Sequence, residues 1–289
     1  MFMRTFLTIT IAACLTAAVA NSQTTTTNLV VTPSSPVFDC KNIVGVPQDA
    51  APGFPFGSFA STGGPASTCR SGGPVTDKTD MYFTPESLFA GRSVTLGDVA
   101  SISYWTKKGT THAANVVDWF INIYTKRYPG QTVSFYGARI GAEPYLAANV
   151  IDPANTWNQW GTGGPTNELR FFESTYSYFG ATTDPDFATF VAGNSLAGSH
   201  GPSAPYAPQP IEFFSIQTST SGSPGFTGQV DGVRIQLQDG SVATINFEPF
   251  VVATDKDACK SDGWKNLFRA DGSAFKNQGD CIQYVNTGK

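Results

Sequence analysis

The sequence is poor in charged residues and in histidine, and it has no cluster of basic residues. Charged side chains make up 14% of its 289 positions, the formal net charge is −4, and the longest basic runs are the pairs Lys107-Lys108 and Lys126-Arg127. Such a charge balance argues against nucleic acid or an anionic membrane as the main partner. The two histidines, His112 and His200, are too few for the multi-histidine zinc sites of hydrolases.

Long apolar runs are absent after residue 20, so no transmembrane segment is expected in the mature chain. Before that point, Arg4 precedes an apolar run from Thr5 to Val19, which ends in the small residues Ala18-Val19-Ala20. A charged start, an apolar middle and a small-residue end are typical of a secretory signal peptide. The pattern therefore predicts a signal peptide at residues 1–20, a mature chain that begins at Asn21, and a secreted, extracellular protein.

Cysteine is scarce but evenly placed. Cys14 lies within the predicted signal peptide, and the mature chain then keeps four cysteines, Cys40, Cys69, Cys259 and Cys281. An even number of cysteines in an exported chain indicates disulfides. Of the three possible pairings we favour Cys40 with Cys69 and Cys259 with Cys281, because each closes a local loop. The alternative is a zinc site, which neither a Cys-x-x-Cys spacing nor a nearby histidine supports.

Glycine and proline are abundant, with 29 and 19 residues, which suits short strands joined by turns. Alternation of apolar and polar residues predicts strands at 28–33, 100–105, 117–124, 132–136, 168–173, 211–217, 229–237 and 242–248. In the segment 117–124 the two predicted faces carry Val117, Trp119, Ile121 and Ile123 on one side and Asp118, Phe120, Asn122 and Tyr124 on the other. One helical turn is predicted at 186–192, with Pro185 in its first turn.

The segment 229–248 predicts a β-hairpin. Val233, Ile235 and Leu237 alternate with polar residues, Asp239-Gly240 supplies a turn, and Ile245 continues the apolar face on the return strand.

These features predict an all-β fold, a jelly-roll-like antiparallel β-sandwich with a small disulfide-closed C-terminal hook. Residues 21–75 are expected to form a loop-rich lead-in that contains the first strand. Residues 76–252 are expected to form the sandwich domain. Residues 253–289 are expected to form a linker and a disulfide-closed tail, which is too small for a core of its own.

Several short motifs, taken in order, resemble a family of bacterial secreted proteins. The tail contributes Cys259-Lys-Ser-Asp-Gly-Trp264, Phe275-Lys-Asn-Gln-Gly-Asp-Cys281 and Tyr284-Val-Asn, and the domain before it contributes Leu96-Gly-Asp-Val99, Ile102-Ser-Tyr-Trp105, Glu143-Pro-Tyr145, Asn155-Thr-Trp-Asn-Gln-Trp160, Val230-Asp-Gly-Val-Arg-Ile235 and Phe247-Glu248. The chain is similar to secreted β-sandwich proteins, described as galactose-binding-like or concanavalin-like, of unassigned function and with a cysteine-bracketed C-terminal tail. The resemblance covers most of residues 76–289 and implies a shape without an activity. Family members often carry a second tryptophan pair where this chain has Phe171-Phe172.

Aromatic residues, at 13% of the chain, suggest a carbohydrate site. The apolar face of a sugar ring stacks on an indole, and neighbouring amides bind its hydroxyl groups. Trp157 and Trp160 lie in a loop-like segment with Asn155 and Asn158, and Tyr145 precedes them. We therefore predict that these five residues bind an extracellular glycan. Large rings also anchor long loops, and that structural role is the alternative.

Asp231 and Glu248 lie on adjacent strands of the predicted hairpin, near its open end. Carboxylates in this arrangement favour a structural calcium ion, with carbonyl groups near Asp80 to complete its oxygen ligands. The alternative is a solvated pair or a partner for Arg234.

The leading hypothesis is a secreted, non-catalytic extracellular protein that binds carbohydrate. The first alternative is a secreted glycan-active enzyme, a hydrolase or a lyase, with acid and base carboxylates drawn from Glu143, Glu168 and Asp184. The second is a structural protein of the cell envelope or matrix. No catalytic residue is assigned, because the strand motifs of sandwich glucanases and lyases are absent.

Overall fold

The computed structural model describes residues 24–62, 69, 78–109, 118–131, 135–174, 181–195, 203–218 and 226–289. The predicted signal peptide lies outside these ranges, as do His112, His200, Val117 and residues 132–134.

The first sheet has seven strands, with β11 at its centre. Its strands are β1 (Thr26–Val31), β2 (Ile43–Pro47), β3 (Gly57–Ser61), β5 (Val99–Lys107), β8 (Asn158–Gly161), β11 (Gln229–Leu237) and β12 (Val242–Phe247). β12 and β5 pair with opposite edges of β11, and β1 and β8 extend the sheet beyond them.

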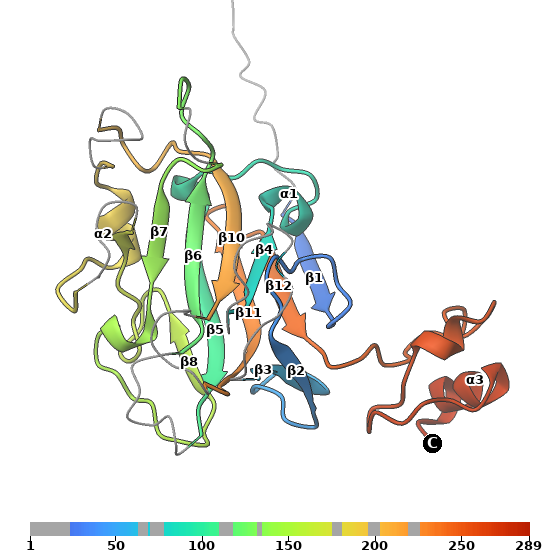
Figure 1. Ribbon diagram of the computed structural model, residues 1–289. Helices are drawn as coiled ribbons and strands as arrows, with labels where there is room; N and C mark the ends of the chain where they lie inside the picture. Colours follow the sequence, from blue (N-terminus) through green and yellow to red (C-terminus); the bar gives the residue numbers. More distant parts are fainter. Residues whose placement is uncertain are drawn as a thin grey trace, which may run out of the picture.

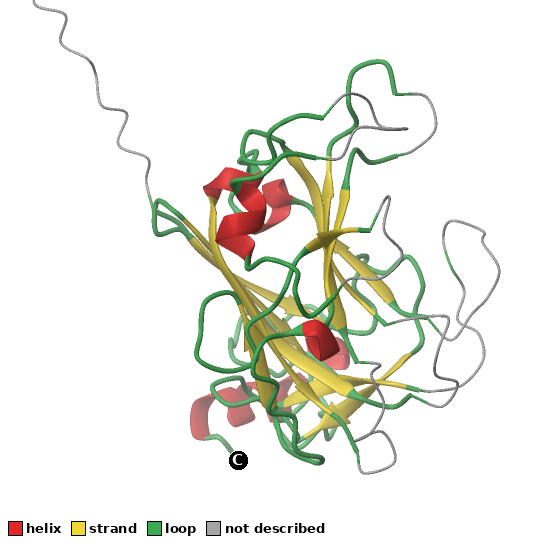
Figure 2. Ribbon diagram, turned by 90° about the vertical axis from the view of Figure 1, so that its left-hand side faces the viewer, coloured by secondary structure: helices red, strands yellow, loops and turns green. Residues whose placement is uncertain are grey.

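The second sheet has five strands. In spatial order they are β4 (Asp80–Phe83), β10 (Ile211–Gln217), β6 (Phe120–Thr125), β7 (Arg139–Ala142) and β9 (Phe172–Glu173). This sheet lies in front of the first in Figure 1, and Figure 2 shows the strands from the side as two layers. The predicted all-β, jelly-roll-like β-sandwich is confirmed.

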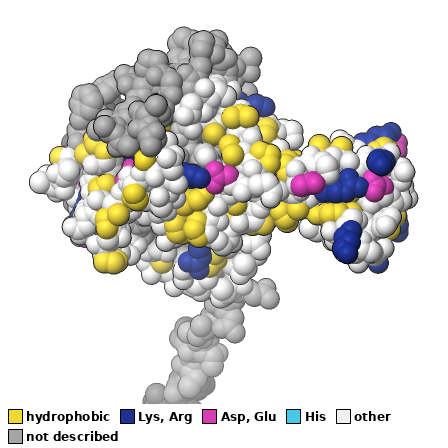
Figure 3. All heavy atoms as spheres, turned by 90° about the horizontal axis from the view of Figure 1, so that it is seen from below, with side chains coloured by type: hydrophobic (Ala, Val, Ile, Leu, Met, Phe, Trp, Pro, Cys, Tyr) yellow, Lys and Arg dark blue, Asp and Glu magenta, His cyan; other side chains and the backbone are white. Residues whose placement is uncertain are grey.

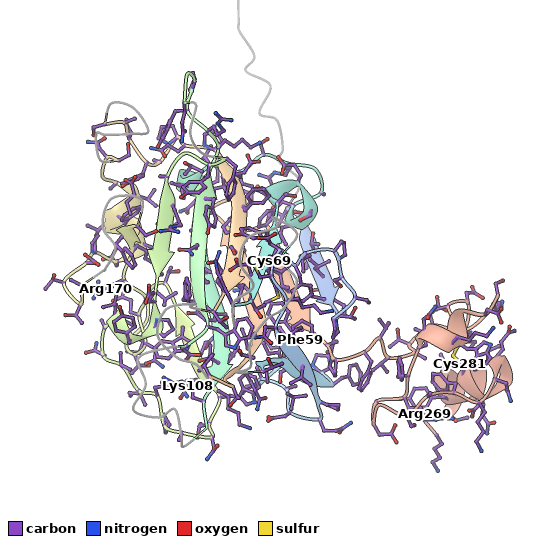
Figure 4. The ribbon with its side chains drawn as sticks, viewed as in Figure 1. Phe59, Cys69, Lys108, Arg170, Arg269 and Cys281 are labelled. Carbon is purple, nitrogen blue, oxygen red and sulfur yellow. A yellow bond between two sulfur atoms is a disulfide. The ribbon has the colours of Figure 1, made fainter. Side chains whose placement is uncertain are left out.

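A single apolar core lies between the two sheets. The second sheet contributes alternate side chains to it, Met81, Phe83, Ile121, Ile123, Ile140, Phe214 and Ile216, and the first sheet contributes Phe59, Val233, Ile235, Ile245 and Phe247. Phe59 is labelled in Figure 4. Burial of each such side chain stabilises the fold by about 1.5–3 kcal/mol. Because a slip of one residue would turn a whole strand's apolar set outward, this core fixes which residues face away from it.

The hairpin prediction is confirmed. β11 and β12 pair antiparallel with Val233 opposite Ile245, and Gly240 in the turn has a φ of 86°. The bounds of β10 and β11 agree with the predicted strands 211–217 and 229–237.

The sequence predicts an antiparallel sandwich, but one pair of strands is parallel. β1 runs parallel to β12 as an edge strand, with Thr26 opposite Val242 and Val31 opposite Phe247. The lead-in also contains β2 and β3, which alternation in the sequence did not reveal. β2 pairs with β3, and Val230 of β11 pairs with Phe59 of β3.

Some predicted strands differ in the described residues. Of residues 132–136, Phe135 and Tyr136 are described, and they form a bend with Gly137, which approaches the Lys126 carbonyl so closely that a Cβ would lie 2.5 Å from its oxygen. Of residues 168–173, two residues form β9, and Glu168 makes isolated bridges instead.

The helices are short and few in the described chain. They are α1 (Pro85–Leu88), α2 (Phe187–Val191), α3 (Gln278–Thr287) and the 3-10 turns η1 (Leu96–Asp98), η3 (Pro144–Leu146) and η4 (Gly263–Asn266). Asp186 caps α2 by accepting from the Thr189 amide, so Pro185 precedes the cap and does not lie in the first turn.

Both favoured disulfides are present, Cys40–Cys69 and Cys259–Cys281. Cys69 lies beside β4, and Cys281 lies in the tail that projects from the sandwich (Figure 4). The tail has a small core of its own, contrary to the expectation, because Ala253 and Phe275 pack on the second disulfide. Figure 3 shows basic side chains gathered on this tail, which holds six of the 18 Lys and Arg residues.

Candidate functional site

The outer face of the second sheet differs in chemistry from its inner face. The register places Ser215 between Tyr82 of β4 and Asn122 of β6, and it places Phe213 opposite Tyr124. Since the residues between them face the core, these five side chains project outward. The outer face therefore combines aromatic and amide side chains in place of aliphatic ones.

Five aromatic side chains form a continuous strip on this face, named here the aromatic strip: Tyr82, Phe213, Tyr124, Phe135 and Tyr136. The Tyr82 ring centroid lies 5.5 Å from that of Phe213 and 5.8 Å from that of Tyr124. Tyr124 lies 5.0 Å from Tyr136 and 6.0 Å from Phe135. These spacings are typical of attractive ring pairs. Phe135 keeps 58% of its surface exposed, Tyr82, Phe213 and Tyr136 are half-buried, and Tyr124 at the centre is buried.

A hydrogen-bond network fixes the centre of the strip. Gln217 Nε2 donates to the Tyr124 hydroxyl at 2.9 Å and to Ser215 Oγ at 2.8 Å. Asn122 Nδ2 donates to Gln217 Oε1 at 3.0 Å. All four side chains are buried, and a satisfied buried network of this kind holds its members in one arrangement. The Tyr124 ring is thus oriented before any ligand arrives.

Two hydroxyl groups of the strip, those of Tyr82 and Tyr124, stay neutral. Burial raises the pKa of Tyr82, and the neighbouring Tyr124 hydroxyl raises it further. Burial also raises the pKa of Tyr124, although its bond from Gln217 lowers it. Both groups therefore remain protonated across the physiological pH range and add no charge to the strip.

Trp160 and Asn158, two of the predicted glycan ligands, are structural. Their segment is not a loop, because Asn158–Gly161 form β8 and Trp160 pairs with Tyr104. Trp160 is 1% exposed, and its Nε1 donates to Thr106 Oγ1 at 2.8 Å. The Asn158 amide donates to Asp152 Oδ1 at 2.8 Å and to the Thr156 carbonyl at 2.9 Å. Neither side chain is available to stack on or bind a sugar.

Trp157, the other predicted platform, is half-buried at the edge of the first sheet. Its Nε1 donates to Asp49 Oδ1 at 3.1 Å, and Lys107 Nζ lies 5.9 Å from its ring centroid. Lys107 also forms an ion pair with Asp49 at 2.8 Å. The remaining two predicted glycan ligands are Asn155 and Tyr145. Asn155 is exposed and has a φ of 56°, and Tyr145, on η3, forms a hydrogen bond with Glu143. Trp157 thus anchors a loop through Asp49 and keeps part of its ring exposed.

A buried ionic cluster lies beside Trp160. Lys108, labelled in Figure 4, forms ion pairs with Asp152 and, at 3.9 Å, with Asp118. Thr106 Oγ1 donates to Asp118 at 2.8 Å and receives the Trp160 indole N–H. The cluster joins the residues before β8 to the end of β5, because removal of Lys108 would leave the buried Asp118 and the half-buried Asp152 without the cation that pairs with both.

The predicted metal ligand Asp231 is occupied by backbone donors. Its Oδ1 accepts from the amides of Gly232 at 2.7 Å and Phe247 at 3.2 Å, and its Oδ2 accepts from the Ala51 amide at 3.0 Å. The carboxylate thus joins the bulge in β11, the end of β12 and the loop before β3. Asp80, whose neighbours were expected to supply carbonyl ligands, lies in the other sheet.

Glu248, the second predicted metal ligand, is buried beside Asn246. Asn246 Nδ2 donates to Glu248 Oε1 at 2.5 Å, while Glu248 Oε2 is buried without a partner. A cation would satisfy that oxygen and a proton would remove its charge, so calcium at Asp231 and Glu248 stays a prediction.

The stability of the protein should fall as pH rises from about 5 to about 8. Burial raises the pKa of Asp118 to about 7, although the charge of Lys108 lowers it. Burial also raises the pKa of Asp231 to about 7, although its backbone donors lower it. Burial and the neighbouring Asp231 raise the pKa of Glu248 to about 8, although the hydrogen bond from Asn246 lowers it. A raised carboxyl pKa means that the folded state holds the proton more tightly, so its stabilisation is present below the ordinary pKa and lost above the raised one. Thermal unfolding at pH 5, 6, 7 and 8 measures the decline.

The matched variants for this pH series are Asp118→Asn and Glu248→Gln. Neither replacement carries a titrating proton, so each should make the midpoint temperature depend less on pH. Carboxyls with lowered pKa values, such as Asp186, titrate below this window and do not mask the effect. A midpoint that rises steadily from pH 5 to pH 8 in the unmodified chain would contradict the assignment.

Each carboxylate of the enzyme alternative has a different partner within the protein. Glu168 pairs with Arg170 at 3.1 Å, Asp184 accepts from the Ala181 amide at 2.6 Å, and Glu143 pairs with Tyr145. A hollow of about 560 Å³ beside α2 is lined by Glu168 and Asp186. Asp186 uses both carboxylate oxygens to bind Thr189.

Comparison with known proteins found no match for the chain among family models, curated proteins or solved structures. The resemblance to bacterial secreted sandwich proteins therefore stays a prediction, and the function is argued from the residues themselves.

The sequence analysis missed Tyr82, Phe135 and Phe213 as site residues. The sequence did carry a signal for this site, because the alternation in residues 117–124 places Asn122 and Tyr124 on the face of their strand opposite Ile121. The same alternation in residues 211–217 sets Phe213, Ser215 and Gln217 against Phe214 and Ile216. Outer-face residues of two predicted strands thus already combined rings with amides.

Proposed function

We propose that the chain is a secreted, non-catalytic extracellular protein that binds a neutral glycan on its aromatic strip. The observation that carries this proposal is the row of packed rings on the outer face of the second sheet, with a fixed amide and hydroxyl network beneath it. Sugar rings stack on aromatic faces, and pre-oriented polar groups bind their hydroxyl groups at little entropic cost.

Export is supported by the signal-peptide pattern at residues 1–20 and by the two disulfides. No helix in the described ranges is long and apolar enough to cross a membrane.

A neutral ligand is favoured by the charges around the strip. Lys78 is paired with Asp80 at 2.7 Å, and Arg139 Nε donates to Ser174 Oγ at 2.7 Å. These cations are therefore already engaged by groups of the protein. Basic side chains are numerous in the tail instead.

A glycan array probed with the purified chain tests the proposal. The unmodified chain should bind at least one neutral glycan, and the double variant Tyr82→Ala, Phe213→Ala should weaken that binding at least tenfold, about 1.4 kcal/mol. Trp157→Ala is the matched control, since it removes a half-buried ring on the other sheet, and it should bind like the unmodified chain. Circular dichroism confirms that each variant is folded.

The other outcomes of the array decide between the alternatives. Binding lost with Trp157→Ala and kept by the double variant would return the site to the first sheet. No binding to any glycan would contradict the proposal and favour a structural protein of the envelope or matrix.

A glycan-active enzyme is the second candidate, and the hollow beside α2 favours it. The hollow holds the carboxylates of Glu168 and Asp186. Backbone donation by the Thr189 amide lowers the pKa of Asp186, so this carboxyl is deprotonated and would act as a base rather than as a general acid. Glu168 forms an ion pair with Arg170. Release of shortened glycans during the array incubation, abolished by Glu168→Gln, would establish this activity.

A further inference from the structure

Two carboxylates lie across from each other at the edge of the second sheet. The segment before Cys40 runs antiparallel to β4, with Phe38 opposite Met81 and with the Asp39 amide donating to the Asp80 carbonyl at 3.0 Å. Phe38 and Met81 both belong to the core. Asp39 follows Phe38 and Asp80 precedes Met81, so both side chains project toward the outer face.

The two side chains are close enough to share one ion. Ligand atoms of Asp39, Cys40 and Asp80 lie within 4.8 Å of one another, and no other such group of three occurs in the part of the chain that the structure describes. Cys40 is in a disulfide and supplies no thiolate, which leaves two hard oxygen ligands. Like charges that face each other across an antiparallel pair destabilise it.

Asp80 has a ligand atom to spare. Its side chain is buried at 3% exposure, and Oδ2 accepts from Lys78 at 2.7 Å. Its Oδ1 is buried and has no hydrogen-bond partner. Burial raises the pKa of Asp80, Lys78 lowers it, and the nearby Asp39 charge raises it again. A buried oxygen of Asp80 thus stays unsatisfied beside a second carboxylate.

We propose that Asp39 and Asp80 bind a divalent cation of the calcium type on the outer face of the second sheet. Hard cations prefer carboxylate oxygens and complete their shell with water and carbonyl groups. The cation would engage Asp80 Oδ1, relieve the repulsion from Asp39 and leave the Lys78 ion pair in place.

This site lies at one end of the aromatic strip, because Asp80 precedes Tyr82 by two residues on the same face of β4. The cation would also tie the segment that carries Cys40 to β4. The site is separate from the pair Asp231 and Glu248, which lies on the first sheet.

Titration calorimetry with calcium chloride, on the full chain after treatment with a chelator and without glycan, tests the proposal. We expect one site with a Kd of about 10⁻⁴ to 10⁻³ M, the range of extracellular calcium modules. Asp39→Asn and Asp80→Asn should each weaken binding at least tenfold. Asp257→Asn, in the exposed tail, should bind calcium like the unmodified chain, and Glu248→Gln reports on the separate hairpin pair.

Asp39→Asn is the deciding variant, since Asp39 is less buried than Asp80 and its replacement disturbs the core least. Circular dichroism checks that both variants are folded. Absence of calcium binding at millimolar concentration, or binding by Asp39→Asn equal to that of the unmodified chain, overturns the proposal. Loss with Glu248→Gln alone would place the cation at the hairpin instead. Because no glycan is present, these outcomes are independent of the glycan array.

Discussion

Replacement of Asp231 by alanine is expected to lower the free energy of unfolding by about 3–6 kcal/mol. The carboxylate accepts hydrogen bonds from the amides of Ala51, Gly232 and Phe247, all of which are buried with it. Each buried donor that loses its acceptor costs about 1–3 kcal/mol, and water cannot easily replace the carboxylate here. Chemical denaturation with the disulfides intact, at pH 8, measures the change.

Asp231→Asn separates this effect from loss of charge alone. The asparagine oxygen can still accept from Gly232 and Phe247, while its amide faces the Ala51 N–H, so about 1–3 kcal/mol should be lost. Asp257→Ala is the matched surface control, because its side chain is 78% exposed, and it should change stability by less than about 0.5 kcal/mol. An Asp231→Ala variant as stable as this control would show that the three hydrogen bonds do not hold the loop, β11 and β12 together.

Trp160→Ala is expected to destabilise the protein by about 3–5 kcal/mol, whereas Trp157→Ala should cost about 1 kcal/mol. The Trp160 ring is buried in the core, so its removal leaves a cavity and frees Thr106 from its indole donor. Trp157 is half-buried and loses chiefly its bond to Asp49. Denaturation of both variants under the same conditions gives the comparison.

Trp160→Phe provides the control for volume. Phenylalanine fills most of the space of the indole but lacks its N–H, so this variant should lose about 1–2 kcal/mol. Equal losses for Trp157→Ala and Trp160→Ala would contradict the placement of one ring in the core and the other at the sheet edge.

The strands that build the core could be predicted from the sequence because their alternation is regular. Val233, Ile235 and Ile245 lie on one face with a turn at Gly240 between them, and the structure places all three in the core. β2 and β3 could not be predicted in this way. Their residues include Gly45, Pro47 and Gly57, which have low strand propensity, and long-range pairing with β11 holds β3 in place.

The site was harder to predict than the fold, because a ring on a strand is apolar whichever face it occupies. Trp160 was assigned to a loop, and its pairing with Tyr104 turns it inward. Tyr82 and Phe213 come from strands far apart in sequence, and they meet through the pairing of β4 with β10. Proximity of that kind depends on which strands are neighbours, which alternation alone does not specify.

Backbone amide shifts, recorded by nuclear magnetic resonance as a glycan that binds on the array is added, test the central claim most directly. We predict that the shifts concentrate in β4, β10 and β6, around Tyr82, Phe213 and Tyr124. Shifts that concentrate around Trp157 in the first sheet, with β4, β10 and β6 unchanged, would contradict the assignment of the ligand to the aromatic strip.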